Sequence, residues 1–115
     1  MMLVDNEIVL VVEPGKDTRA MKLSEAEKAM GPLLVLDPIR GMVPMYDLPM
    51  IYSGRQVITL GKDRFLYGKA MIYKPICDGD IGSVSSLETQ DIRRIFEMQT
   101  VTLCADGQDF PAFRI

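Results

Sequence analysis

Histidine is absent from this sequence of 115 residues, and cysteine is scarce. Histidine is the commonest general base and metal ligand, so its absence excludes Ser-His-Asp and Cys-His catalytic arrangements and most zinc sites. Cys77 and Cys104 are not in CxxC spacing, and we expect two buried or half-buried thiols in a reducing compartment, with a disulfide between them as the alternative. We therefore predict a protein that is not an enzyme and that holds no metal and no cofactor.

The chain also lacks an excess of positive charge and any long apolar run. Its 13 basic and 16 acidic residues leave a net charge of −3, which argues against general binding to nucleic acids. An acidic residue precedes the first apolar run and no basic region does, so the start is not typical of a signal peptide. No apolar stretch approaches the ~20 residues that span a bilayer. We expect a cytoplasmic protein with no membrane partner.

What is present predicts one domain over residues 1 to 115, since 48% of the residues are hydrophobic and 25% are charged. The run IVLVV between Glu7 and Glu13 predicts a central strand that is buried on both faces. Pro14 and Gly15 then predict a type II turn into a second strand over residues 18 to 23. Ser24, three residues before a glutamate, matches a capping box and predicts a short helix over residues 25 to 30.

Further elements follow in the order strand, loop, two strands, helix, two strands. A short strand is expected over residues 33 to 36, irregular structure over 37 to 54, and a hairpin of strands over 55 to 60 and 64 to 74. A helix over 89 to 98 is followed by a hairpin whose strands cover 100 to 104 and 109 to 115, and Pro111 predicts that the last strand is an edge. We expect an α+β domain with a mainly antiparallel sheet of about five to seven strands and two short helices on one face.

Two stretches carry a family resemblance: the opening IVLVVEPGK, and LYGKAMIYK followed by an acidic loop and VSSLETQDIRRIFE. Together they resemble the domain-of-unknown-function family DUF3846, whose members are encoded by phages, plasmids and integrated elements of bacteria. The resemblance implies a small accessory protein of a mobile element. It supplies no catalytic residues.

Two loops match the start of known binding motifs but not their completion. The segment from Glu13 to Lys16 lacks the second glycine and the Lys-Ser/Thr ending of a phosphate-binding loop, so we interpret it as a turn. Asp78 and Asp80 have calcium-loop spacing, but Thr89 stands where a bidentate glutamate is required. We interpret this segment as a solvated loop.

A possible ligand site lies on the predicted strand over residues 64 to 74, whose alternate residues include aromatic rings and a lysine. Rings stack on bases and cations bind phosphate, so this face could hold a nucleotide. The alternative is an aromatic core layer beside a lysine that extends to solvent. The candidate ligand-binding residues are Tyr52, Arg55, Arg64, Phe65, Tyr67, Lys69 and Tyr73.

A possible partner site lies in the proline- and methionine-rich segment over residues 40 to 52. Methionine side chains adapt to varied surfaces, and prolines reduce the entropy lost when the segment becomes ordered. The alternative is a loop folded over the sheet as a lid on the core. The candidate partner-binding residues are Arg40, Met42, Met45, Tyr46 and Met50.

These features predict a binding protein, for which two hypotheses remain open. The first is a protein of a phage or mobile element that binds a host or element-encoded protein, as an inhibitor of a host defence system. The second is a binder or sponge of a small nucleotide-like signal. We also expect a homo-oligomer, most simply a dimer, because two predicted strands are apolar on both faces and only two short helices could cover them.

Overall fold

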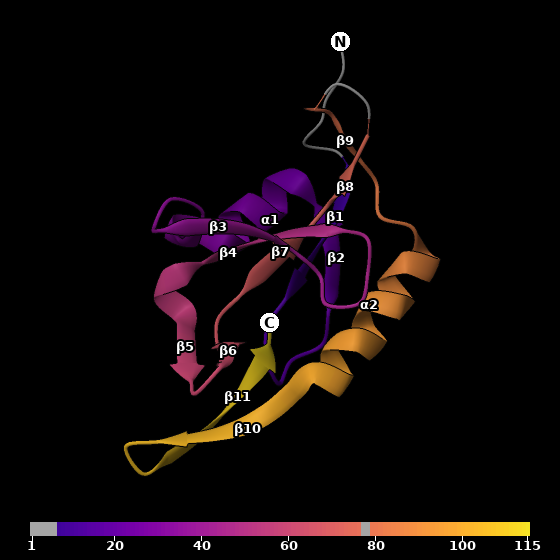
Figure 1. Ribbon diagram of the computed structural model, residues 1–115. Helices are drawn as coiled ribbons and strands as arrows, with labels where there is room; N and C mark the ends of the chain where they lie inside the picture. Colours follow the sequence, from indigo (N-terminus) through magenta and orange to yellow (C-terminus); the bar gives the residue numbers. More distant parts are fainter. Residues whose placement is uncertain (1–6, 77–78) are drawn as a thin grey trace.

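A computed structural model describes residues 7–76 and 79–115, and its largest sheet has five strands. The order of this sheet is β2 (Arg19–Lys22), β1 (Ile8–Val12), β7 (Ala70–Ile72), β4 (Pro49–Ser53) and β3 (Pro38–Met42). The first strand, β1, lies between β2 and β7, and its residues from Val9 to Val12 are buried on both faces (Figure 1). Neighbouring strands pair antiparallel throughout this sheet.

A second sheet of four strands and a short third ladder complete the β structure of the described residues. The second sheet has the order β10 (Thr100–Ala105), β11 (Gln108–Arg114), β6 (Asp63–Leu66) and β5 (Val57–Leu60). The third ladder joins β8 (Lys74–Pro75) to β9 (Ile81–Gly82). All of these pairs are also antiparallel. The predicted α+β class and the mainly antiparallel pairing are therefore confirmed, with the strands divided between sheets.

The two helices, α1 (Leu23–Met30) and α2 (Ser86–Gln99), lie on opposite faces of the five-stranded sheet. Alternate residues of a strand point to opposite faces. Val9 and Val11 pack with Met30 of α1, whereas Leu10 and Val12 belong to the cluster that contains Ile92 of α2. The expectation that both helices lie on one face is therefore wrong. The second helix is also longer than expected, with 14 residues.

The first strands agree with the sequence patterns. All residues of β1 from Val9 to Val12 are buried. Gly15 has a φ of 78°, and the Lys16 amide donates to the Glu13 carbonyl at 3.1 Å, as the predicted turn requires. The helix after β2 begins at Leu23, two residues before the predicted start. The capping box predicted at Ser24 is wrong: the N-cap is Lys22, whose amide donates to the Glu25 carboxylate at 3.3 Å.

Two predictions for residues 33 to 54 are wrong. Residues Gly31–Leu34 form a 3₁₀ helix with proline in its first turn, and no strand forms over 33 to 36. The segment expected to be irregular is a hairpin of β3 and β4. Its prolines are compatible with strands because Pro38 and Pro49 are each the first residue of a strand, where a missing amide hydrogen costs little.

The predicted strand over residues 64 to 74 is divided among three sheets as β6, β7 and β8. The chain leaves β6 at Tyr67, whose amide donates to the Gln56 carbonyl at 2.9 Å. Gly68 follows, and a Cβ at that position would lie 1.3 Å from Oε1 of Gln56. The glycine therefore permits a close crossing between the two larger sheets, which a continuous strand would not make.

The C-terminal part contains a longer helix and the predicted hairpin. Helix α2 begins at Ser86 because Ser85 and Glu88 form a capping box that the sequence interpretation missed. Leu87, in the first turn of this helix, is 68% exposed. The prediction that the last strand is an edge is wrong, because β11 lies between β10 and β6. Strand β6 pairs only with Phe113 and Arg114 of β11, so Pro111 has no partner in β6 that requires an amide donor.

Candidate functional site

The predicted nucleotide-binding residues do not gather on one surface. Tyr52 and Phe65 are buried, and Tyr52 belongs to the core between the sheet and α2. Tyr73 packs with the cluster on the α1 side of the sheet instead. Arg55 lies in the 3₁₀ helix Gly54–Gln56, and Arg64 is exposed on β6. The division of the predicted strand into three separates these side chains.

The two residues expected to hold the ligand have structural partners. The Tyr67 hydroxyl donates to the Arg55 carbonyl at 3.0 Å, and its ring contacts that of Phe110 edge-on at 6.0 Å. Nζ of Lys69 donates to the Ala29 carbonyl at 3.0 Å, in the last turn of α1, where a cation is favourable. These contacts give both side chains a structural role, but Tyr67 is 43% exposed and so is not part of an aromatic core layer, and Lys69 is bonded to α1.

The predicted partner-binding residues lie on the hairpin of β3 and β4, residues 38 to 53, which we call the methionine hairpin. Met42 is 52% exposed and Met45, at the tip, is 67% exposed with a φ of 64°. Met50 faces inward and is buried in the core, so for this residue the lid interpretation holds. Arg40 is exposed but borders a separate hollow on the α1 side.

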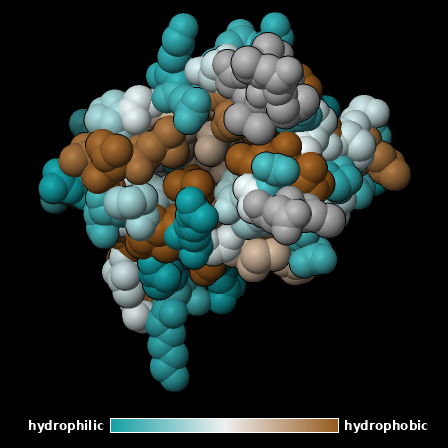
Figure 2. All heavy atoms as spheres, turned by 90° about the horizontal axis from the view of Figure 1, so that it is seen from above, coloured by the Kyte–Doolittle hydropathy of each residue, from teal (hydrophilic) through white to brown (hydrophobic). Residues whose placement is uncertain are grey.

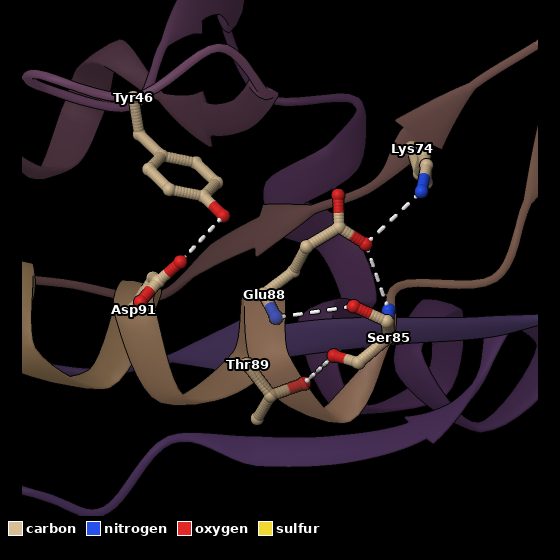
Figure 3. Close-up of polar contacts among 6 residues, drawn as sticks. All are labelled: Tyr46, Lys74, Ser85, Glu88, Thr89 and Asp91. Atoms are coloured by element: carbon tan, nitrogen blue, oxygen red, sulfur yellow. Dashed lines mark hydrogen bonds and ion pairs between the residues drawn. The ribbon is translucent and has the colours of Figure 1, made fainter.

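The tip of the methionine hairpin is fixed against α2. Val43 and Leu48 are buried beneath it, and the Val43 amide donates to the Leu48 carbonyl at 2.9 Å. The Tyr46 hydroxyl donates to Oδ2 of Asp91 on α2 at 3.0 Å (Figure 3). Burial and this carboxylate raise the pKa of Tyr46 above its ordinary value of 10.0.

The start of α2 is joined to β8 by an ion pair next to the hairpin tip. Nζ of Lys74 lies 3.1 Å from Oε1 of Glu88, and the same oxygen accepts from the Ser85 amide at 2.9 Å (Figure 3). The Ser85 hydroxyl accepts from the Glu88 amide at 3.1 Å. The bond from the Ser85 amide and the charge of Lys74 hold the pKa of Glu88 below 4.5, although partial burial opposes them.

Between the hairpin tip and this ion pair lies an open hollow of about 830 Å³. Its hairpin side is mainly apolar but includes Asp47, and Lys74 and Glu88 add charges where β8 and α2 begin. Hydrophobic side chains are also exposed in groups among hydrophilic ones on the face seen in Figure 2. The residues that line the hollow are Met42, Met45, Tyr46, Asp47, Leu48, Pro49, Lys74, Pro75 and Glu88.

The sequence interpretation found the methionines of this hollow but missed Lys74, Glu88 and Asp91. Ser85 and Glu88 have the spacing of a capping box, which was the available signal for the start of α2. Asp91 follows Glu88 by three residues and therefore lies on the same side of the helix. No local pattern could have paired Tyr46 with Asp91, which is 45 residues away.

Replacing Glu88 with glutamine is expected to remove a pH-dependent part of the stability. Because folding lowers the pKa of Glu88, its ionised carboxylate stabilises the folded protein. This contribution is complete at pH values above the ordinary pKa of 4.5, and it is lost as the pH falls through the folded-state pKa. Urea unfolding at a series of pH values should therefore show the wild type more stable than E88Q at neutral pH, with a smaller difference in acid. Glu97→Gln, exposed on the same helix, is the control. An E88Q difference that grows in acid would contradict the assignment.

The described residues contain no cluster of three or more acidic or cysteine side chains suited to a metal ion. Asp78 of the possible calcium loop lies outside the described residues, as does Cys77. Cys104 is a free thiol and is exposed, contrary to the expectation of burial. No helix in the described ranges is long and apolar enough to cross a membrane.

Comparison with family models, with curated proteins and with solved structures finds no match to this chain.

Proposed function

We propose that this chain is a non-enzymatic binding protein that holds a protein partner on the methionine hairpin and its adjoining hollow. The observation that carries the proposal is the exposure of Met42 and Met45 beside a hollow whose walls are fixed by buried residues and polar contacts. Large apolar side chains at a surface mark a contact region when they lie together on a concave wall.

The fixed hairpin supports this function energetically. Binding costs less when the binding segment is already ordered, and Tyr46 holds the hairpin tip through Asp91. The methionine side chains remain free to adjust, since their unbranched thioethers adapt to the shape of a partner. A rigid backbone with adaptable side chains suits a surface that accepts an apolar segment.

The rim of the hollow indicates what the partner should carry. Lys74, Glu88 and Asp47 place charges of both signs around the apolar wall. Protein interfaces combine an apolar centre with a polar rim of this kind. The partner we propose presents one or two large apolar side chains to the methionines and polar groups to the rim.

The biological setting that we propose comes from the family resemblance of the sequence. That resemblance implies an accessory protein of a phage or other mobile element. The corresponding role is inhibition of a host defence protein by occupation of one of its surfaces.

Replacing Met45 with aspartate is expected to weaken capture of the partner by about tenfold or more, because a charge would enter the apolar contact. Met98 on α2 is the matched control, since it is 68% exposed against 67% for Met45 and is not among the residues that line the hollow. Affinity capture from cells that carry candidate defence systems, followed by titration of the captured protein, compares M45D with M98D. Equal binding by the two variants would remove the hairpin from the proposal.

A further inference from the structure

The edges of the two larger sheets differ in their protection against pairing with another chain. Exposed edge strands are usually protected by charged side chains or proline. Strand β2 carries Arg19 and Lys22, and strand β3 carries Pro38 and Arg40. Both edges of the five-stranded sheet therefore have such protection.

The edges of the four-stranded sheet carry no charge and no proline. Strand β10 reads TVTLCA and strand β5 reads VITL. Threonine and valine favour extended structure, and β10 is the longer, with six residues. It lies at the open side of a hairpin that extends away from the rest of the molecule (Figure 1).

The turn of this hairpin determines which backbone groups face the open edge. Asp106 and Gly107 have φ values of 52° and 77°, as in a two-residue type I′ turn. Ala105 and Gln108 then form a hydrogen-bonded pair, and along the ladder such pairs alternate with pairs that share no hydrogen bond. Thr102 lies opposite Pro111 at a position without mutual bonds, which suits a residue that has no amide hydrogen. The alternation directs the backbone groups of three residues toward the open edge: Thr100, Thr102 and Cys104.

The other side of the hairpin is closed to the same kind of pairing. Pro111 offers no donor there, and Asp109 adds a charge. The turn between β1 and β2 also lies against Pro111, because a Cβ on Gly15 would be 2.9 Å from its Cγ. Only the β10 side of the hairpin presents both an unprotected strand and free backbone groups.

We propose that β10 pairs antiparallel with β10 of a second copy of this chain, so that one sheet continues through a two-fold dimer. A strand without charge has no means of selecting a charged partner. It is, however, complementary to itself, because a two-fold axis at Thr102 places threonine opposite threonine and Val101 opposite Leu103 of the other copy. Such a contact closes at two copies, whereas pairing of β10 with β5 would continue without end.

The dimer would leave both methionine hairpins free, since the four-stranded sheet forms the contact and the hairpin belongs to the other sheet. Two copies would then present two partner-binding surfaces. This inference does not depend on the proposed function. Loss of dimerisation and loss of partner capture are separate results in separate variants.

Sedimentation equilibrium over a range of concentrations tests the contact. The wild type should form a dimer with no larger species, and T102V should keep it. Thr102→Lys and Thr102→Glu should each raise the dimer dissociation constant by about tenfold, because like charges would meet at the axis. Mixing the two charged variants should restore the dimer as a heterodimer. A wild type that stays monomeric, open-ended growth, or a dimer that T102K leaves unchanged would overturn the proposal.

The register of the β10–β10 pairing can be tested separately, because Cys104 in β10 is a site for a spin label. A spin label on Cys104, with Cys77→Ser to remove the second thiol, reports on both copies. The proposed axis puts the two Cys104 Cα atoms about 14 Å apart, four residues along the strands and one strand across. Dipolar coupling should appear in the dimer and disappear when T102K is added to the same protein. A dimer without coupling would place the contact elsewhere.

Discussion

Replacing Ile92 with alanine is expected to lower the free energy of unfolding by about 2–5 kcal/mol. Ile92 is fully buried, and it attaches α2 to the face of the sheet formed by Leu10 and Val12. Truncation removes apolar contacts and leaves a cavity that the sheet cannot fill by moving. Urea unfolding followed by circular dichroism measures the loss. Leu87→Ala, exposed on the same helix, should change stability by less than about 0.5 kcal/mol.

The same experiment on the other face tests the placement of the helices. Met30 attaches α1 to Val9 and Val11, and its truncation should also cost about 2–5 kcal/mol. Ile92 and Met30 belong to separate clusters, so the double variant should lose the sum of the two single losses. A double variant that departs clearly from this sum would mean that the two helices share one core.

Replacing Ser53 with alanine should cost about 1–3 kcal/mol, because it leaves two partly buried backbone groups without their hydrogen-bond partner. The Ser53 hydroxyl donates to the Leu36 carbonyl and accepts from the Arg55 amide. Ser53 is fully buried at the base of the methionine hairpin, where the Gly54 amide also donates to the Asp37 carbonyl at 2.8 Å. The substitution should therefore loosen the base of the hairpin as well as destabilise the fold.

Ser86→Ala is the matched control for this prediction. Ser86 is exposed at the start of α2, so its loss should change the free energy of unfolding by less than about 0.5 kcal/mol. Thermal unfolding of the two variants side by side provides the comparison. If S53A proved as stable as S86A, the hydroxyl would not hold the base of the hairpin.

The elements that the sequence predicted well depend on local patterns. The β1 run is bounded by two acids and a Pro-Gly turn, and its strand, its burial and the turn are confirmed. The C-terminal hairpin is likewise confirmed, since an Asp-Gly pair with positive φ fits its two-residue turn. Turn chemistry and short apolar runs act over a few residues, so they can be recognised without the rest of the chain.

The elements that the sequence predicted badly depend on contacts between distant residues. The prolines of residues 38 to 49 indicated a loop, but each occupies a position in the hairpin that tolerates a missing donor. The alternation of residues 64 to 74 indicated one strand, yet Gly68 lets the chain cross Gln56 and change sheets. Neither the start of a strand at a proline nor a crossing at a glycine is visible in the local pattern.

The candidate sites divide in the same way. Met42 and Met45 could be chosen from the sequence because methionine side chains adapt to varied surfaces and are frequent at binding surfaces that accept several partners. Met50 could not be separated from them, since only the register of β4 against β7 places it in the core. The tyrosine face depended on an unbroken strand, and it was lost when that strand proved to be divided.

Amide hydrogen exchange of the protein, alone and with the captured partner, tests the binding surface most directly. The proposal predicts that bound partner slows exchange at the amides of Val43, Met45 and Tyr46 at the tip of the methionine hairpin. Exchange should also slow at the amides of Asp47 and of Lys74 in β8, since both residues line the hollow. The exposed end of α2 at Met98 should exchange unchanged. Protection confined to the segment around Tyr67 and Lys69, with the hairpin tip unaffected, would contradict the proposal.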